Sequence, residues 1–163
     1  MKRVTAEWPT TPRTKDSQHA AIAFAGILIV MALTQLFSFE KFIPLLEGFH
    51  LPGSAAAMMF AATLVVSAVL AAPLLLGMKL RRAMRWVSMV AGWLVVGVWL
   101  FLTIWVNINA PWVDNIGFLG ASVTLTPGWW AVSLVVSLGF LAAWAAWGLW
   151  PGRRTSLESR PKR

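Results

Sequence analysis

Four long apolar runs, separated by short polar connections, make up the hydrophobic pattern of this chain. The runs cover residues 20–37, 54–76, 86–106 and 128–150. A helix that crosses the hydrocarbon core of a bilayer needs about 20 mainly apolar residues, because each residue advances the helix by about 1.5 Å. The pattern therefore predicts an all-α membrane protein in which residues 20–150 form one four-helix transmembrane bundle.

The basic residues are distributed unevenly over the connections, and they predict the orientation of the bundle. Lys41 stands apart from the rest of the 14 Lys and Arg residues. The others precede the first run, join the second to the third, or follow the fourth: Lys2, Arg3, Arg13, Lys15, Lys79, Arg81, Arg82, Arg85, Arg153, Arg154, Arg160, Lys162 and Arg163. Short positively charged segments stay in the cytoplasm. We therefore expect a cytoplasmic head (1–19), a basic cytoplasmic tail (151–163) and a location in a bacterial inner membrane.

Composition supports the membrane class and narrows the choice of partners. Hydrophobic residues make up 58% of the chain and charged residues 12%, which is typical of a polytopic membrane protein and not of a soluble domain. The net charge of +8 follows from the topology and suits attraction to anionic headgroups of membrane lipids. It is therefore no indication of nucleic-acid binding, and bound lipid is the expected small-molecule partner.

The absence of cysteine excludes several kinds of chemistry for this chain. Without thiols it forms no disulfide and holds no iron–sulfur or thiolate metal site. His19 and His50 are the two histidines, and the expected topology places them on opposite sides of the membrane, so they cannot ligate one haem or one metal. We expect no metal site and no resident cofactor, with a quinone kept as an open alternative.

The first outer connection concentrates charge in the segment SFEKFIPLLEGFH, residues 38–50. Its charged or ionisable side chains are Glu40, Lys41, Glu47 and His50. At 100° per residue Glu40 and Glu47 share one helix face, and apolar side chains cover another. The segment predicts an amphipathic interfacial helix that continues the first span and bends at Pro44. Two interpretations stay open: a solvated helix end, or Glu40 and Lys41 facing inward to hold a polar ligand or a partner.

The second outer connection is about 20 residues long and sparingly polar. It contains Trp112, Asp114 and Asn115 and follows Trp105, which ends the third span. Long loops with little charge usually pack against another surface, so we expect this one to contact the first outer connection or a partner protein. The tryptophans of the third span recur every six or seven residues, which we interpret as a stripe along one side of that helix: Trp86, Trp93, Trp99 and Trp105.

Three short motifs occur in an order that suggests a family. They are Phe39-Glu40-Lys41-Phe42 after span one, Pro73-Leu74-Leu75-Leu76-Gly77 before the basic turn, and Asn115-Ile116-Gly117-Phe118-Leu119-Gly120 after span three. With four spans and both ends inside, residues 20–150 resemble the DoxX and MauE group of small redox-associated membrane proteins. In MauE-like members the last motif resembles Asn-Cys-Gly-Cys-Phe-Gly, and its cysteines imply thiol exchange with a partner. Ile116 and Phe118 occupy those places here, so the resemblance implies the scaffold without the thiol chemistry.

These observations favour a non-enzymatic accessory or anchoring subunit of a larger membrane assembly, which the resemblance implies is redox-associated or respiratory. Outer loops and tryptophan-rich flanks would contact the partner. The candidate binding residues are Glu40, Lys41, Glu47, His50, Trp105, Trp112, Asp114 and Asn115. One alternative is a quinone-binding small subunit of a membrane oxidoreductase, which requires those side chains to converge on one pocket. A small transporter is a further alternative, weakened by the lack of ionisable residues within the later spans.

Overall fold

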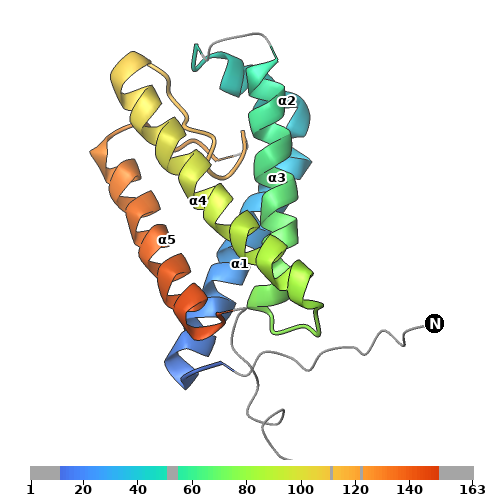
Figure 1. Ribbon diagram of the computed structural model, residues 1–163. Helices are drawn as coiled ribbons and strands as arrows, with labels where there is room; N and C mark the ends of the chain where they lie inside the picture. Colours follow the sequence, from blue (N-terminus) through green and yellow to red (C-terminus); the bar gives the residue numbers. More distant parts are fainter. Residues whose placement is uncertain (1–11, 51–54, 111, 122, 151–163) are drawn as a thin grey trace, which may run out of the picture.

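The described part of the chain is entirely helical, as the sequence predicts. The computed structural model describes residues 12–50, 55–110, 112–121 and 123–150. They contain five helices: α1 (Lys15–Phe37), α2 (Phe39–Glu47), α3 (Ala56–Leu75), α4 (Arg82–Asn109) and α5 (Trp129–Gly148). All but α2 are long and apolar enough to cross a membrane, so the chain is a multi-pass membrane protein with a four-helix bundle (Figure 1).

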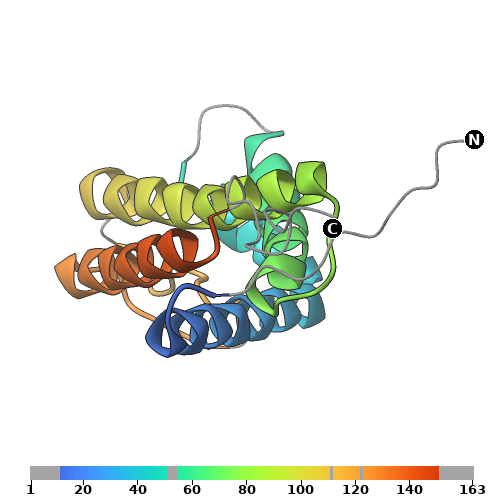
Figure 2. The ribbon, with the colours of Figure 1, turned by 60° about the horizontal axis from the view of Figure 1, so that its bottom comes forward.

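The four long helices form a ring in which each contacts two neighbours. α1 packs on α3 and α5, and α4 packs on the same two helices, so α1 and α4 lie on a diagonal of the bundle (Figure 2). One end of the bundle holds the start of α1, the α3–α4 turn and the end of α5 (Figure 1). We call this the terminal end, and the opposite end, where α2 lies, the α2 end.

The predicted spans lie close to the observed helices, with differences at their ends. The expected span 20–37 is the later part of α1, which begins at Lys15 because the side chain of Thr14 caps it. Helix α4 is longer than the third expected span, 86–106, because it starts within the basic turn and buries Arg85 in its first turn. Most of the predicted head, and the whole predicted tail, lie outside the described residues.

Small side chains let the helices approach closely at the centre of the bundle. Along α3 the buried face repeats at intervals of four and three residues: Ala57, Ala61, Leu64, Ala68 and Ala71. Lipid offers no hydrophobic drive for helices to associate, so close packing of small residues is what holds such a seam together. Large apolar side chains face outward along α1, α3, α4 and α5, as expected for surfaces in contact with acyl chains.

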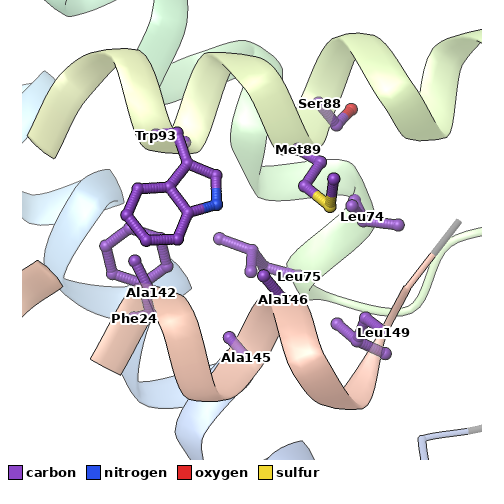
Figure 3. Close-up of a pocket in the computed structure, with 11 residues that line it drawn as sticks. Phe24, Leu74, Leu75, Ser88, Met89, Trp93, Ala142, Ala145, Ala146 and Leu149 are labelled. Carbon is purple, nitrogen blue, oxygen red and sulfur yellow. The ribbon is translucent and has the colours of Figure 1, made fainter. Parts of the chain in front are cut away.

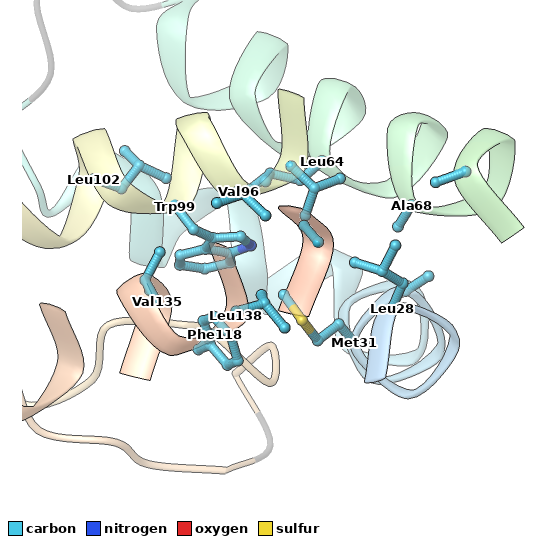
Figure 4. Close-up of a cluster of buried hydrophobic side chains, with 14 of the residues drawn as sticks. Leu28, Met31, Leu64, Ala68, Val96, Trp99, Leu102, Phe118, Val135 and Leu138 are labelled. Carbon is cyan, nitrogen blue, oxygen red and sulfur yellow. The ribbon is translucent and has the colours of Figure 1, made fainter. Parts of the chain in front are cut away.

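The interpretation of the α4 tryptophans as one stripe is wrong. Trp99 is fully buried in the core, Trp86 and Trp93 are exposed, and Trp105 is half-buried. A step of six residues turns a helix by about 600°, which is 120° away from the starting face. The tryptophans therefore face different surroundings, and Trp99 packs among core side chains from the other helices (Figure 4).

Candidate partner-binding site

The short helix α2 is amphipathic. Its apolar face packs on the bundle, so its charged side chains face away from the bundle. Phe42 and Leu46 are fully buried, whereas Glu40, Lys41 and Glu47 are exposed. The predicted division of faces is therefore correct. Since both Glu40 and Lys41 are exposed, the alternative in which they face into the bundle is wrong.

The chain turns between α1 and α2 at Ser38 and not at Pro44, where the bend was expected. α1 ends at Phe37 and α2 begins at Phe39, while Pro44 lies inside α2. The Ser38 hydroxyl donates a hydrogen bond of 2.7 Å to the Thr34 carbonyl oxygen. The hydrogen of the hydroxyl is used in this bond. Its oxygen can still accept a hydrogen bond from another group.

That further donor comes from the connection between α4 and α5, residues 110–128, which we call the α4–α5 loop. The Ala121 amide donates to the Ser38 hydroxyl at 2.9 Å. One turn earlier on α1, the side-chain amide of Gln35 donates to the Phe118 carbonyl oxygen at 3.1 Å, and Gln35 is only 1% exposed. The loop is therefore hydrogen-bonded to the end of α1 and to Ser38, the first residue of the first outer connection. Of the two contacts expected for the loop, the first outer connection or a partner protein, the structure shows the former.

Asn115 holds the loop in shape from within. Its Oδ1 accepts hydrogen bonds from the Gly117 amide at 2.9 Å and the Leu125 amide at 3.1 Å. Its Nδ2 donates to the Gly120 carbonyl oxygen at 3.4 Å. Asn115 is buried, so its polar atoms serve the loop itself. This is a structural role, different from the ligand or partner contact predicted for this residue.

Two glycines allow the loop to approach α1 and α2 closely. Gly117 and Gly120 have φ of 73° and 70°, a left-handed conformation that glycine adopts without strain. A Cβ on Gly117 would lie 2.8 Å from a methyl carbon of Leu45. A Cβ on Gly120 would lie 2.7 Å from the Thr34 carbonyl oxygen and would also collide with the Ser38 hydroxyl.

The loop also sends an aromatic side chain into the bundle. Phe118 is 5% exposed, and its ring centroid lies 5.0 Å from that of Trp99. In Figure 4 Phe118 reaches the layer formed by Trp99, Val135 and Leu138. Ile116 is buried as well. Both side chains are thus part of the hydrophobic core, and the loop fills the α2 end of the bundle.

The remaining predicted residues are exposed at the α2 end, with one exception. Trp112 is 65% exposed and meets the exposed ring of His50 edge-on, with centroids 5.9 Å apart. Asp114 is exposed beside it in sequence. Trp105 is the exception, because its indole N–H donates to the Phe49 carbonyl oxygen at 2.9 Å and ties α4 to the end of α2.

The α2 end therefore presents a set of exposed polar and aromatic side chains, which we call the rim. Beneath them lie the α4–α5 loop and the end of α1, which we call the support. The rim consists of Glu40, Lys41, Glu47, His50, Trp112 and Asp114. Gln35 and Ser38, which were not predicted as site residues, lie beneath the rim and bind the loop. Gln35 could have been predicted, because it is a glutamine near the end of an apolar span and a buried amide in a membrane needs a hydrogen-bond partner.

Two cavities among the described residues lie near the terminal end, away from the rim. One is a small apolar space of about 20 Å³ between α4 and α5, lined by Trp93, Met89, Ala142 and others (Figure 3). Ser88 contributes to its lining, is 2% exposed and has no hydrogen-bond partner for its hydroxyl. The other is an open groove between α1 and α5, lined by Thr14, Asp16, Trp144 and Trp147.

Comparison with known proteins assigns no relative. The chain matches no family model, and no curated protein or solved structure is significantly similar to it. Within the described residues no three His, Cys, Asp or Glu side chains gather in a way that could hold a metal ion.

Proposed function

We propose that this protein is an accessory membrane subunit that docks a partner protein through the rim at its α2 end. The observation that carries the proposal is the α4–α5 loop, which is hydrogen-bonded to α1 through Gln35 and Ser38 and fills the mouth of the bundle. Because the chain's own loop fills the α2 end, a partner that contacts the outer surface is favoured over a ligand that enters the bundle.

The chemistry of the rim suits a protein surface as its partner. It combines charges of both signs, Glu40 and Lys41 on α2, with the paired rings of His50 and Trp112. Mixed charge gives specificity and orientation, and exposed tryptophan is enriched at the centres of interfaces. Because the support is already folded, binding would order few additional residues.

The charge distribution and the family resemblance extend the proposal. If basic connections stay in the cytoplasm, both termini are cytoplasmic, and the rim faces the opposite side, which in a bacterial inner membrane is the periplasm. The resemblance to the DoxX and MauE group suggests a partner in a redox or respiratory assembly. The absence of thiols in this chain leaves any thiol chemistry of such an assembly to the partner.

Purification from the native membrane in a mild detergent, followed by mass spectrometry of proteins and small molecules, tests the proposal. The test variant replaces both charges of Glu40-Lys41 by glutamine. The matched control is Arg81→Gln with Arg82→Gln, an adjacent and exposed pair of charges at the terminal end. We expect a stoichiometric partner protein with the wild type and the control, and a recovery reduced roughly tenfold with the rim variant.

Two results would overturn the proposal. One is equal recovery of the partner with the rim variant and the control. The other is recovery of the protein alone with a stoichiometric quinone, which would favour the quinone-binding alternative.

A further inference from the structure

The open groove at the terminal end combines features that match a particular lipid headgroup. α1 begins beside the end of α5 there (Figure 1), and the Arg13 amide donates to the Gly148 carbonyl oxygen at 3.2 Å. Trp144 and Trp147 stand one turn apart on α5, and Thr14 and Asp16 of the α1 start face them across the groove. Both tryptophans are about half exposed, at 54% and 49%.

The groove lies at the depth of lipid headgroups. α1 has 23 residues, so at about 1.5 Å per residue it spans the roughly 30 Å of hydrocarbon with little excess. Asp16 is in its first turn, and tryptophans near helix ends are typical of the membrane interface. At this depth a lipid headgroup can occupy the groove while its acyl chains lie along the bundle.

The two charges at the groove, Asp16 in its lining and the neighbouring Arg13, form no ion pair with each other. The guanidinium carbon of Arg13 lies 4.1 Å from the centroid of a Trp147 ring. Asp16 is exposed, and within the described residues its carboxylate forms no ion pair or hydrogen bond. The groove is thus lined by a carboxylate and two tryptophans, and an exposed cation lies over one of the two rings.

Asp16 distinguishes the groove from the rest of the terminal end. Among the described residues of this end it is the sole carboxylate. The exposed cations there are Arg13, Lys15, Lys79, Arg81 and Arg82. Those cations attract anionic lipids in general, whereas a carboxylate repels them. A ligand that uses the whole groove must carry a positive charge as well as a negative one.

We infer that the groove binds the headgroup of phosphatidylethanolamine. Its phosphate meets the Arg13 guanidinium, and its ammonium lies between the Asp16 carboxylate and the Trp144 ring. A primary ammonium donates charge-assisted hydrogen bonds to a carboxylate and is attracted to the face of an indole. The quaternary ammonium of phosphatidylcholine has no N–H to donate, and phosphatidylglycerol has no cation. This inference is independent of the partner proposed for the rim.

Native mass spectrometry of the purified full-length protein tests this inference. The delipidated protein is mixed with equal amounts of phosphatidylethanolamine, phosphatidylcholine and phosphatidylglycerol that carry identical acyl chains. We expect phosphatidylethanolamine to be retained in preference to the other two. Asp16→Asn should lower its retention roughly tenfold, because a hydrogen bond to a charged group is lost, and Asp16→Glu should restore much of it.

Matched controls separate the groove from general lipid contact. Asp114→Asn removes an exposed carboxylate from the opposite end and should leave retention unchanged. Trp144→Leu should lower retention, whereas Trp129→Leu, at an α5 tryptophan that is 71% exposed, should not. Unchanged retention in Asp16→Asn, equal binding of phosphatidylcholine, or a preference for phosphatidylglycerol would each overturn the assignment.

Discussion

The two ends of the bundle differ in how far the chain's own residues fill them. At the α2 end Gln35, Ser38 and Asn115 are buried, and each is hydrogen-bonded to or within the α4–α5 loop. Near the terminal end the buried Ser88 hydroxyl has no hydrogen-bond partner among the described residues and borders a small cavity, and the groove beside Asp16 is open. The chain thus fills the α2 end with its own loop, whereas a groove and a small cavity remain near the terminal end.

The largest effect is expected where the closed end is tightest, at Gly120. Gly120→Ala should lower the free energy of unfolding by about 2–5 kcal/mol, because the left-handed φ is strained and the methyl group collides with Thr34 and Ser38. The control is Gly77→Ala, with φ 69° but no atom within 4 Å of the added Cβ. It should lose only the strain, about 1–2 kcal/mol. Thermal unfolding in detergent measures both, and equal losses would show that the loop is not packed at Gly120.

The next effect concerns the hydrogen bonds inside the loop. Asn115→Ala removes the acceptor of two backbone amides and should cost about 2–4 kcal/mol. Asn109→Ala is the control, since within the described residues that exposed side chain bonds only to its own helix, at the Trp105 carbonyl oxygen. It should change stability by about 0.5 kcal/mol or less. A similar small change in both variants would contradict the structural role of Asn115.

The fold could be predicted from the sequence because lipid imposes a simple requirement on length and polarity. The four apolar runs contain the cores of α1, α3, α4 and α5, and the spacing of Glu40 and Glu47 predicts the exposed face of α2. Periodicity suffices in these cases, because burial there depends on the position of a residue along one helix.

The candidate site could be predicted only in part, because sequence does not show which polar groups bind each other. Asn115 and Trp105 were predicted to contact a ligand or partner, and both use their polar atoms for contacts within the chain. Gln35 was not predicted, although it holds the loop. These bonds join residues distant in sequence, such as Gln35 and Phe118, and no local pattern encodes such a pair.

A pair of serines compares the two ends directly. Ser38→Ala removes a hydroxyl that accepts from Ala121 and donates to Thr34, and it should cost about 1–2 kcal/mol. Ser88→Ala removes a buried hydroxyl without a partner, and it should be neutral or stabilise by up to about 1 kcal/mol. Changes of the same sign and size in thermal unfolding would remove the distinction between the ends.

The smallest effect on stability is expected at the rim. Replacing the charges of Glu40 and Lys41 with glutamine should change the free energy of unfolding by about 0.5 kcal/mol or less, because both side chains are exposed. The same unfolding measurement checks this. A loss of more than about 1 kcal/mol would mean that these residues support the fold and are not available for a partner.

Hydrogen exchange at the backbone amides of the α4–α5 loop tests the closure of the α2 end most directly. The amides of Gly117, Ala121 and Leu125 donate to the side chains of Asn115 and Ser38. We predict that in the purified protein these three amides exchange much more slowly than exposed backbone. The backbone amide of Asp114, an exposed residue whose amide donates no hydrogen bond within the described part of the chain, serves as the internal reference. Exchange of all four at the same fast rate would contradict a closed α2 end and, with it, the preformed rim.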